Sequence, residues 1–400
     1  MSAALSSQTL LTIGILLASS FIVGEIFERI GLESIIGYVV TGILFGPGLS
    51  KAAEIFNFIP QNFALSPEPV AGFATVGATL ILFQAGLQEE NVVEIFTHKE
   101  GLKLGVSALL GTFLFVFGAL YFLSPEFVPA HGAQAFVFLA LAYAVVDIGV
   151  PSKIMLSRDM LHGDFGSYTI KSSVINVTSG FIALTLLVVM ASNSLEAQIM
   201  KIAAIIGFAL AFYILHEFIQ EIDDYVMMFE EAEAQFTITF ALLLFMAYIT
   251  RTIGLSSVLG AFFAGVLVSR SDFTNSRAFQ DKIQGIGEGL FIPIFFAWFG
   301  LGLTIFGSHG MLAYLPAAVF LFTLSTAGKL AIGYFLAERH GSDSALAVAS
   351  SLVALDIESL VVLLIGINLG VLEHSILQVF APAVLFSAPT ILFLYSLAER

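Results

Sequence analysis

The chain has 400 residues, of which 58 % are hydrophobic and only 11 % are charged, and its mean hydropathy is +0.97. This composition excludes a soluble globular protein and predicts a membrane protein. The formal net charge of −15 argues against nucleic-acid binding, and the absence of cysteine excludes disulfides, thiolate metal sites and palmitoylation.

Apolar runs long enough to cross a bilayer follow one another along the chain. A run of about 17 to 25 apolar residues in a helix spans the hydrocarbon core. The N-terminal run has neither a basic region before it nor a cleavage site of small residues, so we expect it to be retained. The sequence thus predicts an all-α polytopic membrane protein with about thirteen transmembrane helices, at 8–27, 33–47, 70–88, 101–123, 132–153, 165–192, 197–219, 233–252, 256–270, 283–307, 311–337, 343–370 and 374–398.

The basic residues indicate the orientation of these spans. With the N-terminus outside, eleven lysines and arginines fall on the inner side and three, Lys51, Lys201 and Arg251, on the outer side. Lys329 belongs to neither set, because it lies inside the eleventh span. The positive-inside rule therefore predicts an outer N-terminus and a cytoplasmic C-terminus.

The chain also repeats itself. IGLESIIGYVVTGIL at 30–44 aligns without gaps on IGLSSVLGAFFAGVL at 253–267, with seven identities in fifteen positions. Gly37 and Gly42 align with Gly260 and Gly265, and a Gly-Leu pair at 86–87 answers one at 300–301. Small residues such as these also serve close helix packing, so it is their common register that indicates a repeat.

An odd number of spans between the copies gives the second copy the opposite orientation in the membrane. We expect one membrane domain over residues 1–400, with repeat one at about 8–192, a linker helix at 197–219 and repeat two at about 233–398. Such an inverted-topology repeat is the architecture of many secondary transporters. The chain ends at Arg400, two residues beyond the last span, so we expect no cytosolic regulatory domain.

Two acids lie at matching places in the two repeats. Asp147 and Asp356 each lie in an apolar stretch, within the strings VDI and LDI. Ionisable groups at membrane depth are costly and mark transport sites. Gly149 and Pro151 follow Asp147 and should open the helix near its carboxylate, because proline removes a donor and clashes with the preceding turn. No proline follows Asp356, and no glycine follows it before Gly366, so we expect a weaker break there.

Five segments, in their order along the chain, resemble signature segments of the second monovalent cation:proton antiporter family. This family includes bacterial sodium/proton exchangers and potassium efflux systems. The segments are ERIGLESIIGYVVTGILFGPGL at 28–49, VGATLILFQAGLQ at 76–88, GLSSVLGAFFAGVLVS at 254–269, IPIFFAWFGLGLTI at 292–305 and AGKLAIGYFLAER at 327–339.

The resemblance implies a sodium/proton antiporter-like fold with two broken helices that cross near the bilayer midplane. It implies a homodimer in the inner membrane of a prokaryotic cell, built from a scaffold domain and a mobile core domain. Movement of the core would expose one carboxylate site to each side of the bilayer in turn. The implied activity is the exchange of a monovalent cation, sodium or potassium, for protons.

The chain departs from the family where the family binds its ion. The resemblance places an aspartate in the sixth helix, preceded by aspartate, asparagine or glutamine. The matching stretch here is SSVINVTSG, with Asn176 at the first position and Val177 at the second. The family's ion-binding carboxylate is therefore missing.

Other positions of the family's site are altered or kept. Asp147 matches a fifth-helix position where related exchangers carry Thr-Asp-Pro, and the frequent Arg-Gly-Glu of the twelfth helix is replaced by a string from Asp356 to Glu358. Lys329 matches a lysine that pairs with the sixth-helix acid in some members. Its partner here must be another group, such as one of these three acids.

We interpret these residues as a rearranged ion- and proton-binding site. Asp147 would be the carrier carboxylate, Asp356 and Glu358 would complete the cation cage or hold protons, and Lys329 would be the competing internal cation. Hard monovalent cations suit oxygen ligands. We expect no cofactor, no metal beyond the transported cation, and no enzyme activity, because no nucleophile and base form a recognisable motif.

Neutral oxygen ligands would come from Asn176 and Thr178. Simpler roles remain open: Asn176 as a link between helices, and Asp147 as a permanent partner of Lys153 or Arg158.

A static ion pair between Asp356 and Lys329 is a third such possibility. Two other functions remain open as well. The scaffold could carry a different small solute such as an anion, or act as a transport-inactive sensor.

Overall fold

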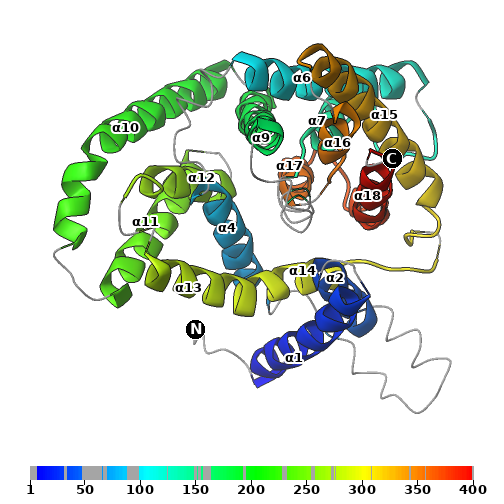
Figure 1. The fold of residues 1–400 in the computed structure, drawn as a ribbon. Coiled ribbons are helices and arrows are strands. Elements are labelled where there is room, and N and C mark those ends of the chain that lie inside the picture. Colours follow the sequence, from blue (N-terminus) through cyan, green and yellow to red (C-terminus); the bar gives the residue numbers. More distant parts are fainter. Residues whose placement is uncertain are drawn as a thin grey trace. The chain divides into compact units, whose positions relative to one another are not determined.

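The structure is a computed structural model. It describes residues 7–30, 34–46, 65, 70–87, 99–123, 125–147, 151, 155, 164–191, 195–227, 232–253, 257–271, 274, 276–307, 309–341, 344–355 and 357–398. All regular secondary structure in these ranges is helical, as predicted (Figure 1).

Each of the thirteen predicted spans coincides with a helix in the described part of the chain. By length and composition, eight helices there could cross a membrane, and five apolar helices are shorter. The helices are α1 (Ser7–Arg29), α2 (Ser34–Phe45), α4 (Ala71–Leu87), α6 (Lys99–Leu123), α7 (Gly132–Ala144), α9 (Asp164–Met190), α10 (Leu195–Met227), α11 (Ala232–Thr252), α12 (Ser257–Val268), α13 (Arg277–Ile286), the π-helical turn η3 (Gly287–Phe291), α14 (Ile292–Leu301), α15 (Leu315–Arg339), α16 (Ala345–Ser351), α17 (Ile357–Asn368) and α18 (Ile376–Ala398).

The chain divides into two compact units, each built from segments far apart in the sequence. Unit 1 comprises residues 1–90 and 193–305, and unit 2 comprises residues 91–192 and 306–400. Unit 1 thus holds the first three predicted spans of each repeat together with the linker helix α10. Unit 2 holds the last three spans of each repeat, among them the spans of Asp147 and Asp356.

In unit 1, glycines that align between the repeats make equivalent contacts. A Cβ on Gly42 of α2 would lie 2.7 Å from the Cα of Gly300 in α14, and one on Gly265 of α12 would lie 2.9 Å from the Cα of Gly86 in α4. Gly42 aligns with Gly265, and Gly86 aligns with Gly300. In each contact, the first glycine of one repeat therefore packs on the second glycine of the other repeat. The aligned glycines of the two repeats therefore serve the same kind of close helix packing.

The Gly42→Ala substitution is expected to destabilise unit 1. Its methyl group would overlap the carbonyl oxygen of Ala297, and neither backbone can move freely in a packed interface. Overpacking of this kind costs about 1–3 kcal/mol. We expect the variant to have a lower melting temperature in detergent. The melting temperature is measured by size-exclusion chromatography of heated samples. Gly14→Ala in α1 is the matched control, since nothing lies within 4 Å of its Cβ position, and equal melting of both variants would contradict the prediction.

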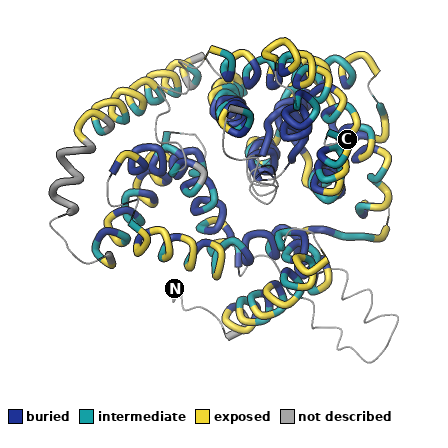
Figure 2. The backbone as a smooth tube through the Cα atoms, viewed as in Figure 1, coloured by how far each residue is buried: buried dark blue, intermediate teal, exposed yellow. Residues whose placement is uncertain are grey.

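In unit 2 the long helices cover the short helices α7, α16 and α17. The long helix α6 packs on α9, α15 and α7, and α15 also packs on α16 and α18. Figure 2 shows α7, α16 and α17 almost wholly buried, whereas α6 and α15 each keep an exposed flank. That flank carries large apolar side chains such as Phe122 and Phe335, which suits contact with lipid. The short helices thus form the interior of the unit.

Both predicted interruptions occur in this interior. Helix α7 ends at Ala144, and Val145 after it is extended, with ψ at 142°. In the second copy, α16 ends at Ser351 and α17 begins only at Ile357, so this helix is fully interrupted. Our expectation of a weaker break at this place is wrong. Proline and glycine were not needed, because other elements bind the freed backbone groups, as the site shows.

Candidate functional site

The two interrupted helices are bonded to each other at their breaks. The backbone N–H of Asp147 donates a hydrogen bond to the carbonyl oxygen of Ala354 at 3.3 Å. Unsatisfied backbone groups cost several kcal/mol each in a membrane interior, so a break must provide partners for its own N–H and C=O groups. This bond satisfies one group from each break and fixes Asp147 at the crossing.

Helix α15 supplies the donors that the breaks lack. Lys329 is fully buried, and its Nζ donates to the carbonyl oxygens of Val145 at 2.8 Å and Ala354 at 3.4 Å, one from each interrupted helix. One turn earlier, the Ser325 hydroxyl donates to the carbonyl of Tyr143 at 2.6 Å. Lys329 therefore links the two breaks by hydrogen bonds and also brings an ionisable group to them. Sequence reasoning missed Ser325, although its spacing of four residues places it on the same helix face as Lys329.

Asn176 on α9 holds the first break from the other side. Its Oδ1 accepts the backbone N–H of Val146 at 3.1 Å, and its Nδ2 donates to the carbonyl of Gly105 on α6 at 3.3 Å. The close approach of α6 and α9 requires glycine there, since a Cβ on Gly105 would overlap the carbonyl oxygen of Ser172. The amide is thus engaged at both ends, which favours a positioning role for Asn176.

Two of the predicted acids come together at the crossing. Asp147 and Glu358 are each only 5 % exposed, and Glu358 lies in the first turn of α17. Asp147 is within electrostatic range of both Lys329 and Glu358. The third predicted acid, Asp356, lies outside the described residues, as do Lys153 and Arg158, the alternative partners of Asp147.

Three buried polar atoms of α7 and α17 are without hydrogen-bond partners among the described residues. They are Oε2 of Glu358, Oγ of Ser359 and Oη of Tyr143, all buried. Buried polar atoms are normally hydrogen-bonded, and an exception points to a missing water, proton or ion. An unpartnered carboxylate oxygen next to a second acid can accept a proton or a hard cation.

Thr178 is buried on α9 but does not share the face of Asn176, because residues two apart lie on different sides of a helix. Within the described part of the chain, no hydrogen bond links Thr178 to Asp147, Lys329 or Glu358. The structure therefore brings together four of the six predicted residues: Asp147, Asn176, Lys329 and Glu358.

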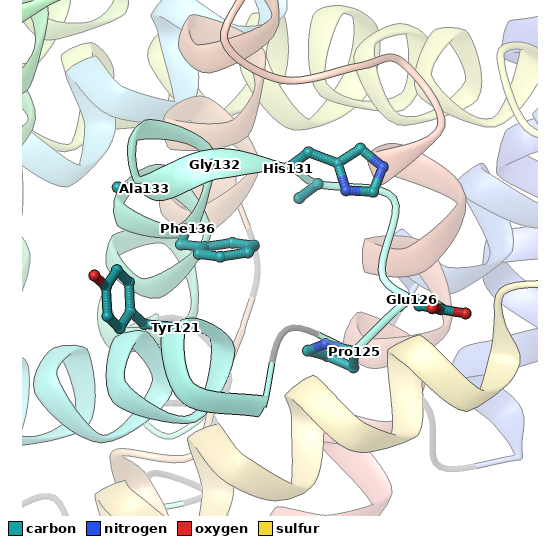
Figure 3. A pocket seen from close by; sticks show the side chains of 8 residues that line it. Tyr121, Pro125, Glu126, His131, Gly132, Ala133 and Phe136 are labelled. Carbon is teal, nitrogen blue, oxygen red and sulfur yellow. The ribbon is translucent and has the colours of Figure 1, made fainter.

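A hollow of about 350 Å³ lies at the start of α7, lined by Tyr121, Glu126, His131 and Phe136 among others (Figure 3). The thirteen residues of α7 separate it from the break by about 20 Å at 1.5 Å per residue. Its lining is largely exposed, so it is a surface feature distinct from the buried crossing.

Residues 15–395 match the family described as "Sodium/hydrogen exchanger, transmembrane". The chain is similar to a Na(+)/H(+) antiporter of Enterococcus hirae, with 25 % identity over 93 % of each chain. The fold is similar to that of the sodium proton antiporter MjNhaP1 from Methanocaldococcus jannaschii, with a TM-score of 0.62 and 13 % identity over 96 % of this chain and 95 % of that one.

Eukaryotic relatives are longer than this chain. It is 23 % identical to cation/H(+) antiporter 18 of Arabidopsis thaliana over 98 % of this chain and 49 % of the relative. It is 25 % identical to K(+)/H(+) antiporter 1 of Saccharomyces cerevisiae over 90 % of this chain and 43 % of the relative. The chain thus spans about half the length of these two relatives.

Proposed function

Because the chain belongs to the sodium/hydrogen exchanger family and is a multi-pass membrane protein, we propose that it exchanges sodium or potassium for protons by alternating access. The observation that carries this proposal is the buried pair of acids, Asp147 and Glu358, at the bonded crossing of two interrupted helices.

Competition for one site would couple the two fluxes. A deprotonated Asp147 binds the cation, and a protonated Asp147 returns without it, so cation and proton exclude each other. Glu358, with its unpartnered Oε2, is the second ligand or proton carrier, and Asp356 is the third member of the group by its place in the sequence. This arrangement replaces the sixth-helix aspartate that the chain lacks at Val177.

Two of the remaining predicted residues take supporting roles. Lys329 balances part of the negative charge and ties the breaks together through two carbonyl oxygens. Asn176 positions the first break, with one lone pair of Oδ1 left for an ion. Thr178 lies on another face of α9, so we assign it no ligand role at the crossing. The crossing offers the oxygen atoms of two carboxyl groups, which are ligands for a cation and favour a cation over the alternative of an anion.

We place the protein in the inner membrane of a prokaryotic cell as a homodimer, with the N-terminus outside and the C-terminus in the cytoplasm. The orientation follows from the basic residues. The homodimer follows from the family resemblance. Helix α10 exposes large apolar side chains, including Ile206, Leu210 and Tyr213, which require a cover of lipid or protein.

Reconstitution tests the function directly. Proteoliposomes with an acidic interior and an internal pH dye are diluted into sodium, potassium or choline salts at equal ionic strength. We expect sodium or potassium, but not choline, to drive proton efflux, whichever anion accompanies it. Gradient collapse that depends on the anion and not on the cation would refute the proposal in favour of anion transport. No response to any ion would favour the transport-inactive sensor.

A further inference from the structure

A second cavity in unit 2 lies where α6 and α9 begin and α15 ends. Its volume is about 670 Å³, and it is lined by Glu100, Lys103, Tyr168, Leu336, Arg339 and His340. The basic residues of these ends belong to the side that the sequence predicts as cytoplasmic. None of the six residues takes part in the crossing of the interrupted helices.

Basic groups exceed acidic ones around this cavity. Lys103 pairs with Glu100 at 2.7 Å, and Glu100 also lies 3.9 Å from Nδ1 of His340. Glu100 is the one acid of the lining, while Arg339 adds a second full positive charge. The lysine pair is exposed at 63 % and 40 %, so solvent screens it and its contribution to stability is small. The ammonium group of Lys103 can therefore leave Glu100 and bind an anion of higher charge.

The lining also holds N–H donors that suit an oxyanion. The rings of Tyr168 and His340 are stacked with centroids 4.5 Å apart, and Tyr168 is buried, so the imidazole is held against the wall. The imidazole can donate an N–H in either tautomer. Arg339 lies over Phe335 at 4.2 Å, which keeps its guanidinium beside the cavity. Guanidinium and ammonium groups together are typical partners of phosphate.

We propose that this cavity binds a phosphate-bearing anion that links α6, α9 and α15. Arg339 follows Lys329 by ten residues on α15, about 15 Å along the helix, and Tyr168 precedes Asn176 by eight residues on α9, about 12 Å. An anion bound between the end of α15 and the start of α9 would restrain both helices. These helices carry Lys329 and Asn176, which hydrogen-bond to the interrupted helices. The phosphate belongs either to a lipid headgroup or to a soluble anion.

The test measures the melting temperature of the purified protein in neutral detergent. Inorganic phosphate is titrated in one arm and phosphatidylglycerol in the other, each against sodium chloride or phosphatidylcholine at matched concentration. A ligand that binds only the folded state raises the melting temperature as its concentration increases. A response to the lipid alone identifies a headgroup site, and a response to inorganic phosphate identifies a site for the soluble anion.

Two variants separate a defined site from general screening of charge. The double variant Lys103→Gln, Arg339→Gln should weaken the apparent affinity for the effective probe by at least about 10-fold, because two charge-assisted hydrogen bonds are lost. Arg277→Gln on α13 of unit 1, an exposed basic residue predicted at the same membrane surface, should leave the affinity unchanged. No shift with either probe, or equal shifts in all three proteins, would overturn the proposal. This readout does not depend on transport, so it can fail while the exchange activity stands.

Discussion

Replacement of Asp147 by Asn is expected to abolish cation-driven proton exchange while the protein stays folded. The amide keeps the shape of the side chain but cannot take up and release a proton. The bond to Ala354 is made by the backbone N–H of residue 147, so the crossing persists in the variant. We expect the initial rate in the proteoliposome assay to fall by about 100-fold or more, the range over which loss of a proton-transferring group acts.

Two further variants make this experiment specific. Glu126→Gln in the same unit removes an exposed acid of the surface hollow and should leave the rate unchanged. Glu358→Gln removes the neighbouring buried acid and should lower the rate as well, since Oε2 of Glu358 is without a partner in the described structure. Normal exchange by Asp147→Asn, with an intact elution profile, would show that the carrier acid lies elsewhere.

Replacement of Lys329 by Met is expected to give the largest loss of stability. Methionine is similar in length but donates no hydrogen bond, so the carbonyl oxygens of Val145 and Ala354 both lose their lysine donor. Asp147 loses its nearby positive charge at the same time. Removal of one partner from a buried charged group costs about 3–5 kcal/mol.

The measurement is the melting temperature in detergent, determined by size-exclusion chromatography of heated samples. Lys99→Met is the control. Lys99 is an exposed lysine at the start of α6, and its loss should change the melting temperature little. A Lys329→Met protein as stable as the parent would mean that water or another side chain replaces the lysine at both breaks. The role of Lys329 as a tie would then be wrong.

The helices and their order could be predicted because they depend on local composition. Each span is a run of neighbouring apolar residues, and the bilayer sets its length. An opening near Asp147 was predictable from Gly149 and Pro151, although helix α7 already ends at Ala144, before both residues. The interruption before Ile357 was underestimated, because its cause is not local: the carbonyl of Ala354 is bound by Asp147 and Lys329 from other elements.

The partners of the predicted site residues could not be found from the sequence. Lys329 contacts Val145 across 184 positions and Ser325 contacts Tyr143 across 182 positions, and no spacing rule relates such residues. Asn176 has the chemistry of an ion ligand in the sequence, yet its amide is engaged by Val146 and Gly105. Only the packed unit shows which polar groups are already satisfied.

The sequence by itself determined the membrane class, the helical character of the chain, the paired glycines of the two repeats and the buried position of Asp147, because hydrophobicity and self-similarity can be read along the chain. The tertiary structure alone decided that Asp147 meets Glu358, that a lysine and a serine of α15 hold the breaks, and that the repeats divide between two units. The physical reason is that unpaired backbone groups must find donors inside the protein, and those donors come from whichever helix the fold brings near.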